Sequence, residues 1–173
     1  IESVGVLHHM RNPLVGWKIL SDILKPGGLM MIGLYSKLAR KHITSIRSKF
    51  KKNNNKIKNE DIKLFRKKII ISKSENNELI KNSPDFYSLS SLIDLIFNVQ
   101  EHTFTIPEIK INIDKLGLEF CGFEGKENLK IFQKNYTNIQ DLYNLDYWNQ
   151  FEKKNPRNFA GMYQFWCQKM SKF

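Results

Sequence analysis

The stretch that decides the fold class is Ile1–Ser36, with the sequence IESVGVLHHMRNPLVGWKILSDILKPGGLMMIGLYS. Within it, Ile1–Leu7 is a short, mostly apolar run rich in β-branched residues, and it stops at the polar pair His8–His9. Leu29–Tyr35 is a second apolar run of strand length. Runs of this kind are typical of strands that are buried on both faces. The sequence therefore predicts one buried strand at each of these two places.

A helix is expected between the two strands. Asn12 can cap its first turn, and Pro13 fits there because the N–H that proline lacks would have no partner in any case. Its apolar residues recur at three- to four-residue spacing, at Leu14, Trp17, Leu20 and Leu24. Pro26-Gly27-Gly28 ends the helix, since proline cannot continue it and glycine accepts a positive φ. A strand, a helix and a strand in this order predict a right-handed crossover and parallel strands.

The carboxyl ends of these two strands are the expected place for a ligand. In open parallel sheets, ligands bind in the crevice outside the strand ends. The residues that would face such a ligand are His8, His9, Met10, Tyr35 and Ser36.

Residues 37–98 interrupt the alternation of strands and helices. Amphipathic spacing predicts a helix from about Lys37 to Phe50, a second at Asn59–Ile71 and a short third at Glu75–Lys81, with a polar connector at Lys51–Asn59. We interpret the segment as a helical insertion that covers the crevice and shapes the substrate pocket.

The last part of the chain, residues 99–173, should return to the sheet. Thr105 and Glu108 form a T-x-x-E capping box for a helix that ends at Gly117. Leu118–Phe123 is a predicted strand, and Gly161–Lys169 is a last strand that should pair with it antiparallel. Helical segments are also expected within residues 128–135 and 139–154. Before residue 99, one more helix is expected to begin after Ser88 or Ser90. Its apolar face would carry Leu92, Ile93, Ile96 and Phe97.

The net charge of the 173 residues is +11, from 28 Lys and Arg against 17 Asp and Glu. A charge of this size is common in proteins with anionic partners. The excess is concentrated in Lys37–Lys68, where Asn and Ile are also frequent. This pattern favours a solvated basic face and makes nucleic-acid binding the less expected interpretation.

The sequence also indicates where the protein is located and in which redox state its two cysteines are found. No window offers the roughly 20 apolar residues of a membrane span, and no signal segment precedes the first strand. We therefore expect a cytoplasmic protein with no membrane partner. Cys121 and Cys167 lie far apart in apolar runs, which predicts buried reduced thiols. Because the chain opens on strand residues and Ile1 is not an initiator methionine, we expect a piece of a longer polypeptide.

Two sets of motifs resemble a known family. SVGVLHHM, LKPGG and LMMIGLYS resemble the fourth strand, the following helix and the fifth strand of class I S-adenosylmethionine-dependent methyltransferases. SPDFYSLSSLIDLIFNVQEHTFTIPEI, LGLEFCGFE and YWNQFEKKNPRNFAGMYQFWCQK are similar to the carboxyl-terminal half of methyltransferase domains attached to bacterial tetratricopeptide-repeat proteins. The resemblance covers nearly the whole chain.

The resemblance implies an α/β fold, namely a partial Rossmann-like methyltransferase sheet with strands that correspond to 4-5-7-6 of the family. Residues 1–36 would form the strand–helix–strand unit, residues 37–98 the helical insertion, and residues 99–173 the last helices and the antiparallel strand pair. The family's Gly-rich loop has no counterpart in this sequence. We therefore expect these residues alone to bind the implied cofactor, S-adenosyl-L-methionine, weakly or not at all. A tetratricopeptide-repeat domain is a possible neighbour in the parent chain.

The candidate catalytic residues are His8, His9, Glu101 and His102. The two adjacent histidines could make structural hydrogen bonds at the strand end or line the pocket. Metal ligation is the least favoured interpretation, because no Cys or carboxylate lies beside them at ligand spacing, and no metal site is predicted. Glu101 could orient the imidazole of His102 and raise its basicity.

The remaining candidates come from the resemblance and from the strand ends. By resemblance, Val4, Gly5 and Val6 would flank the methionine part of the cofactor. The candidate substrate-binding residues are Tyr35, Ser36, Asp85 and Tyr87.

The implied reaction is methyl transfer to an unidentified acceptor, a small molecule or a protein. Transfer from a sulfonium is an in-line displacement that needs alignment and sometimes a base, so a conspicuous catalytic triad is not required. Two other classes are kept as alternatives, a basic nucleic-acid-binding module and a non-catalytic methyltransferase-like interaction domain.

Overall fold

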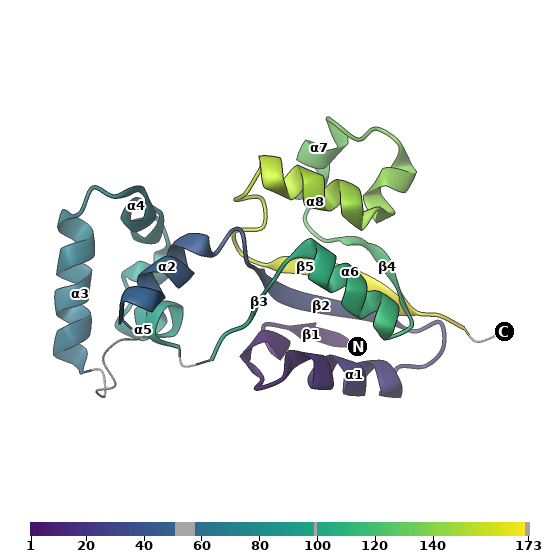
Figure 1. The fold of residues 1–173 in the computed structure, drawn as a ribbon, viewed down its shortest axis with the longest axis horizontal. Helices are drawn as coiled ribbons and strands as arrows, with labels where there is room; N and C mark the ends of the chain where they lie inside the picture. The colour runs from purple at the N-terminus through teal and green to yellow at the C-terminus, as the bar shows by residue number, and fades with distance from the viewer. Residues whose placement is uncertain (51–57, 99, 172–173) are drawn as a thin grey trace. The chain divides into compact units, whose positions relative to one another are not determined.

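The computed structural model describes residues 1–50, 58–98 and 100–171. The chain divides into two compact units (Figure 1). Ile1–Ala39 and Gln100–Phe173 form the first, which we call the sheet unit, and Arg40–Val99 form the second, which we call the helical unit.

The sheet unit contains five strands: β1 (Glu2–Val4), β2 (Leu29–Ser36), β3 (Thr103–Phe104), β4 (Leu118–Phe123) and β5 (Tyr163–Lys169). Four of them follow the order β1-β2-β5-β4, and β3 pairs with β2. β1 and β2 are parallel, with Glu2 opposite Met31 and Val4 opposite Gly33. β5 is antiparallel to both β2 and β4. The expected parallel pair at the start and the antiparallel pair at the end are thus confirmed.

The first strand is shorter than the apolar run predicts. The run Ile1–Leu7 suggested seven strand residues, but β1 stops at Val4. Gly5 has φ +77°, in the left-handed region that glycine adopts readily, and this turns the chain out of the sheet. His8 and His9 consequently lie in a short 3₁₀ helix, η1 (Leu7–His9), and do not continue the strand.

Helices of the sheet unit begin where their capping residues predict. Asn12 Oδ1 accepts hydrogen bonds from Leu14 N and Val15 N at the start of α1 (Pro13–Ile23). The capping box of Thr105 and Glu108 begins α6 (Ile106–Lys115). The other elements are α7 (Lys126–Gln133), the 3₁₀ helix η3 (Ile139–Tyr143) and α8 (Leu145–Lys154). α1 and α8 pack on the same face of the sheet, because Trp17 contacts Phe165 and Glu152 accepts from Tyr163, and these two β5 residues, two positions apart, point to one face. In Figure 1, α6 lies between α1 and α8 in front of the sheet.

The core of the sheet unit is rich in aromatic residues. Trp17, Trp148, Tyr163 and Phe165 are fully buried. Trp148 stacks on Phe132, with ring centroids 3.8 Å apart. Burial of large aromatic side chains stabilises the unit, because it removes much apolar surface from water.

Close packing between β1 and β2 depends on Gly33. A Cβ atom at this position would lie 2.8 Å from Val4 Cγ1 and 3.0 Å from Val4 Cα. We therefore expect Gly33→Ala to lower the free energy of unfolding by about 2 kcal/mol, because β1 must move away. Urea denaturation followed by tryptophan fluorescence measures this change. Gly161→Ala is the matched control, since its Cβ would meet no atom within 4 Å. Equal stability of the two variants would contradict this packing.

The helical unit contains α2 (Lys41–Phe50), α3 (Asn59–Ile71), α4 (Glu75–Lys81), the 3₁₀ helix η2 (Pro84–Phe86) and α5 (Leu89–Phe97). The predicted bounds of α3 and α4 are confirmed, whereas α2 begins at Lys41 and not at Lys37. Ser88 caps α5 by accepting from Ser91 N. The connector predicted at Lys51–Asn59 lies mostly outside the described residues. The core consists of Ile43, Ile46, Ile62, Phe65, Ile69, Ile80, Phe86, Leu92, Leu95 and Ile96.

Both cysteines are free thiols. Cys167 is buried in β5, and burial raises its pKa to about 12. Cys121 is half-buried at the irregular part of β4. None of the helices in the described ranges has the length and apolar character needed to cross a bilayer.

Candidate active site at the carboxyl ends of the parallel strands

Three aromatic side chains meet where β1 and β2 end. His8 is fully buried, and its Nδ1 lies 3.4 Å from the carbonyl oxygen of Gly33. The His8 ring centroid lies 4.0 Å from that of Tyr35 and 4.3 Å from that of His9. The first strand places His8 at this edge, and the second places Tyr35 there. The sequence-based expectation that these residues gather at one edge is confirmed.

The segment before α6 joins this cluster through its backbone. His102 N donates to the carbonyl oxygen of His8 at 2.8 Å, and His9 Nδ1 lies 3.2 Å from the carbonyl oxygen of Gln100. β3 then pairs with β2, with Thr103 opposite Tyr35. Glu101 and His102 therefore lie in the sheet unit beside the two adjacent histidines. Their sequence motif predicted a loop between two helices and missed the short strand.

Ser36 takes part in a different set of contacts. It is fully buried, and its Oγ donates to Glu152 Oε1 at 2.6 Å and accepts from Ala39 N at 3.0 Å. Tyr163 OH donates to the same carboxylate oxygen at 2.6 Å. The Ser36 hydroxyl thus holds the end of β2 to α8 and to the turn that follows β2. A role of Ser36 in substrate binding stays a prediction.

Glu152 is the residue of this edge that sequence reasoning missed. It is 3% exposed. Burial raises the pKa of its carboxyl group, and the hydrogen bonds from Ser36 and Tyr163 only partly oppose that rise. Burial and the neighbouring carboxylate also raise the pKa of Tyr163. A signal was present in the sequence, because Glu152 follows Trp148 by four residues and so shares its inward face of the helix.

The candidate cofactor-binding residues form the turn between β1 and η1. Val4 and Gly5 are half-buried, whereas Val6 is 55% exposed. An added Cβ at Gly5 would meet no atom within 4 Å. The surface of this turn is therefore open on the side of Gly5 and Val6, as a wall of a binding site would require.

The two remaining candidates belong to the helical unit. Asp85 lies in η2 and is exposed, and Tyr87, the residue after η2, is 69% exposed. The Tyr87 ring makes an edge contact with Phe86, with centroids 5.3 Å apart. The contact explains how the ring is held within its own unit, and the substrate role of both residues stays a prediction.

The side chains of this site are of the kinds that take part in proton transfer. In the described ranges, no group of three or more His, Cys, Asp or Glu side chains is arranged to hold a metal ion. Histidine, tyrosine and carboxylate groups at the mouth of a crevice can align a polar acceptor and take up a proton from it.

The fold of this chain is similar to part of the fold of PKMT2 from Rickettsia typhi, as comparison with solved structures shows. The structure of PKMT2 from Rickettsia typhi in complex with AdoHcy matches 100% of this chain and 36% of its own, with a TM-score of 0.66 and 12% sequence identity. A second structure of the same protein matches 100% of this chain and 35% of its own, with a TM-score of 0.65 and 12% identity.

Curated proteins also match this chain in sequence. An uncharacterized protein of Synechococcus sp. (strain ATCC 27144 / PCC 6301 / SAUG 1402/1) is 23% identical over 161 residues, which cover 87% of this chain and 39% of that protein. No family model matches the chain. The chain spans less than two fifths of the length of the proteins it matches. Its resemblance to methyltransferases attached to tetratricopeptide-repeat proteins stays a prediction.

Proposed function

We propose that this chain forms part of an S-adenosylmethionine-dependent methyltransferase and contributes one wall of the cofactor site. The observation that carries the proposal is the match over the whole chain to a methyltransferase in complex with AdoHcy, the product that remains when the cofactor has lost its methyl group. The turn at Val4–Val6 lies at the carboxyl edge of the parallel pair, where ligands of such sheets bind.

In this proposal, different residues at the strand ends contact the cofactor, align the acceptor and supply a general base. Val4, Gly5 and Val6 flank the methionine part of the cofactor. The rings of Tyr35 and His8 are in contact at the same edge and form the floor on which the acceptor is aligned. His9, His102 and Glu101 are the groups from which a general base for the acceptor would come. The acceptor itself is a small molecule or a protein.

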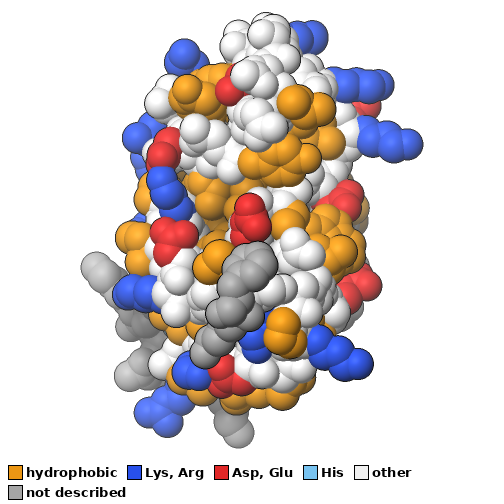
Figure 2. Space-filling model, turned by 90° about the vertical axis from the view of Figure 1, so that its right-hand side faces the viewer, with side chains coloured by type: hydrophobic (Ala, Val, Ile, Leu, Met, Phe, Trp, Pro, Cys, Tyr) orange, Lys and Arg blue, Asp and Glu red, His pale blue; other side chains and the backbone are white. Residues whose placement is uncertain are grey.

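The face of the molecule in view in Figure 2 shows no continuous basic stripe that would favour a nucleic-acid-binding module. Figure 2 shows Lys and Arg side chains mainly around the edge of the face in view, with Asp and Glu and hydrophobic groups between them. A surface that tracks a phosphate backbone is expected to carry a continuous basic stripe. A methyltransferase-like domain without catalysis is the second candidate, because the described sequence lacks a Gly-rich cofactor loop.

Isothermal titration of AdoHcy into the full-length product of the gene that encodes this chain tests the proposal. We expect a Kd in the micromolar range, and Val6→Glu should weaken binding at least about tenfold, because a charged side chain replaces an apolar contact at the cofactor. Ile19→Glu is the matched control, since Val6 and Ile19 are both 55% exposed but Ile19 lies on α1. No binding to the unsubstituted protein would favour the non-catalytic domain, and equal binding by both variants would contradict the proposed wall.

A further inference from the structure

The helical unit carries most of the net positive charge of the chain. Residues 40–99 contain 14 Lys and Arg against 6 Asp and Glu, whereas the whole chain has 28 against 17. A concentration of charge of one sign attracts partners of the opposite sign and raises the rate at which they meet. The part of the chain best suited to an anionic partner is therefore the helical unit.

Helix α3 turns one apolar face toward the core of this unit. Ile62, Phe65 and Ile69 recur at three- to four-residue spacing, and all three are buried in that core. Phe65 contacts Phe97 of α5 edge to face, with ring centroids 5.6 Å apart. Figure 1 shows α2, α4 and α5 together on one side of α3. We call the opposite side of α3 its outer face.

The outer part of α3 presents aliphatic side chains to water. Leu64 is 57% exposed, Ile70 54% and Ile71 80%, and no other large hydrophobic residue in the described ranges is as exposed as Ile71. Leu64 and Ile71 are seven residues apart, which is two turns of helix, so they lie on one line along the outer face about 10 Å apart. Aliphatic side chains gathered in this way favour a contact that removes them from water.

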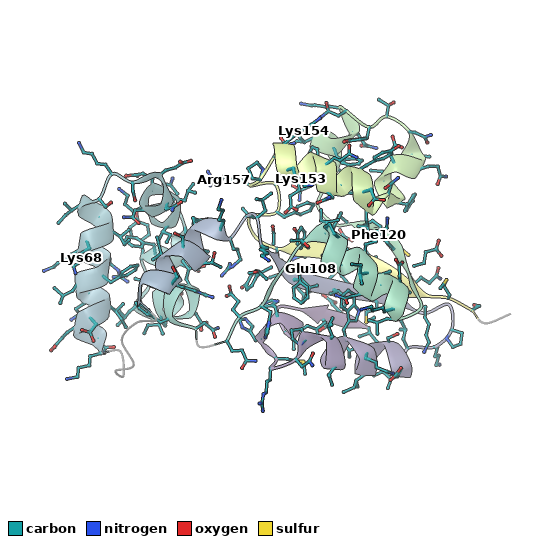
Figure 3. All side chains as sticks on the ribbon, viewed as in Figure 1. Lys68, Glu108, Phe120, Lys153, Lys154 and Arg157 are labelled. Carbon is teal, nitrogen blue, oxygen red and sulfur yellow. The ribbon has the colours of Figure 1, made fainter. Side chains whose placement is uncertain are left out.

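Lysine side chains lie beside this line. Lys67 and Lys68 follow Leu64 by three and four residues, so they lie on either side of the line between Leu64 and Ile71. Lys63 is also exposed, and Lys68 is labelled on α3 in Figure 3. None of these three lysines forms an ion pair or a side-chain hydrogen bond with the residues that the structure describes. Their charges are therefore available to a partner.

The acidic residues of α3 are confined to its first turn. Glu60 and Asp61 lie there, where the positive end of the helix dipole favours a carboxylate, and Asp61 also accepts from Lys58 N at 2.9 Å. From residue 62 to the end of α3, every charged side chain is a Lys or an Arg. The part of the outer face that carries the aliphatic side chains is therefore basic.

Aliphatic side chains between lysines match an anionic lipid surface better than they match a nucleic acid. At a bilayer surface, ammonium groups meet the headgroup anions while aliphatic side chains enter the boundary of the acyl chains. Along a nucleic acid, basic side chains contact phosphates and aromatic side chains stack on bases. Phe65, the one aromatic residue of α3, is buried in the core, and the aliphatic side chains of the outer face would stay in water on a nucleic acid.

We propose that the outer face of α3 binds the surface of an anionic lipid bilayer. Leu64 and Ile71 enter the boundary between headgroups and acyl chains, and Lys63, Lys67 and Lys68 contact the headgroup anions. The contact is peripheral and needs no spanning helix. It departs from the expectation of no membrane partner, which was drawn from the lack of a spanning segment in the sequence. The surface belongs to the helical unit and does not depend on methyl transfer.

Co-sedimentation of the full 173-residue chain with lipid vesicles tests the proposal. One set of vesicles contains phosphatidylcholine alone, and the other contains equal parts of phosphatidylcholine and phosphatidylserine. The apparent Kd for the anionic vesicles should be at least about tenfold lower than that for the neutral ones. It should rise at least about tenfold between about 0.1 M and about 0.5 M NaCl, because salt screens the lysines. Equal binding to both sets, or no binding, would overturn the proposal.

Charge substitutions separate α3 from the net charge of the chain. Lys67→Ala combined with Lys68→Ala should raise the apparent Kd for anionic vesicles at least about tenfold. Lys126→Ala combined with Lys130→Ala is the matched control, because it removes the same charge from two exposed positions of α7 in the sheet unit. This control should change the apparent Kd less than about threefold. Equal losses in the two variants would show that only net charge counts and would refute the role of α3.

Apolar substitutions test the insertion. Leu64→Gln combined with Ile71→Gln keeps the charge and should raise the apparent Kd at least about fivefold. Ile19→Gln combined with Ile23→Gln, at positions of α1 that are 55% and 68% exposed, should leave it unchanged. Because all these positions are exposed, the melting temperatures should stay unchanged. Undiminished binding by the α3 variant would contradict the insertion. Tighter binding of the unsubstituted chain to duplex DNA than to anionic vesicles would assign the surface to a nucleic acid instead.

Discussion

Trp148→Ala should lower the free energy of unfolding of the sheet unit by about 3–5 kcal/mol. Trp148 is fully buried, stacks on Phe132 at 3.8 Å and packs against Phe123 at 5.0 Å between ring centroids. Its Nε1 also donates to the carbonyl oxygen of Leu142 at 2.9 Å. Alanine leaves a cavity among rigid aromatic neighbours and removes the link between α8 and η3, so relaxation can recover only part of the lost packing.

Urea denaturation measures this loss. Trp17 and Trp166 remain in the variant, and both lie in the sheet unit, so tryptophan fluorescence follows that unit and not the helical one. Tyr143→Ala serves as the control, because Tyr143 is 49% exposed, and its loss should cost less than about 1 kcal/mol. A Trp148→Ala variant as stable as the control would show that α8 does not pack as described.

Glu152→Ala should cost about 3 kcal/mol, since it leaves the buried hydroxyl groups of Ser36 and Tyr163 without their common acceptor. Glu152→Gln keeps an oxygen acceptor at the same place, and its cost should be about 1 kcal/mol or less. The exposed neighbours Lys153 and Lys154, labelled in Figure 3, provide a control through Lys153→Ala, which should be nearly neutral. Equal stability of the Ala and Gln variants would contradict the shared-acceptor arrangement.

The same carboxyl group makes stability depend on pH. Its folded-state pKa is raised above the ordinary value of 4.5, because burial disfavours the charged form. The contribution of the neutral carboxyl is therefore fully present below pH 4.5 and is lost as the pH rises through the raised folded-state pKa. The difference in unfolding free energy between Glu152→Gln and the unsubstituted chain should shift in favour of the Gln variant across this range. A difference that is constant with pH would contradict the raised pKa.

Local signals in the sequence predicted much of the sheet unit. The Asn12 cap, the stop at Pro26-Gly27-Gly28 and the capping box of Thr105 and Glu108 act within one or two turns of helix, so they can be recognised without knowledge of the fold. The parallel pairing of β1 with β2 followed from the connection between them. From that pairing, the meeting of His8 with Tyr35 could be expected.

The missed features depend on contacts between distant residues. β3 has only two residues and exists because β2 offers it a partner. The end of β1 at Val4 is set by the conformation of Gly5, which an apolar run does not reveal. Glu152 meets Ser36 across 116 positions of the sequence, and no local pattern predicts that pair. The substrate-binding role predicted for Asp85 and Tyr87 likewise depends on which residues surround them in space, and the sequence around η2 does not reveal this.

Photo-crosslinking of methyl-tritiated S-adenosylmethionine to the full-length gene product tests most directly the claim that the turn after β1 is a cofactor wall. Tryptic digestion and mass spectrometry then locate the label. We expect it in the peptide that ends at Arg11 and contains Val4–His9, and excess unlabelled AdoHcy should suppress it. Label confined to other peptides, or label that AdoHcy does not suppress, would contradict the account.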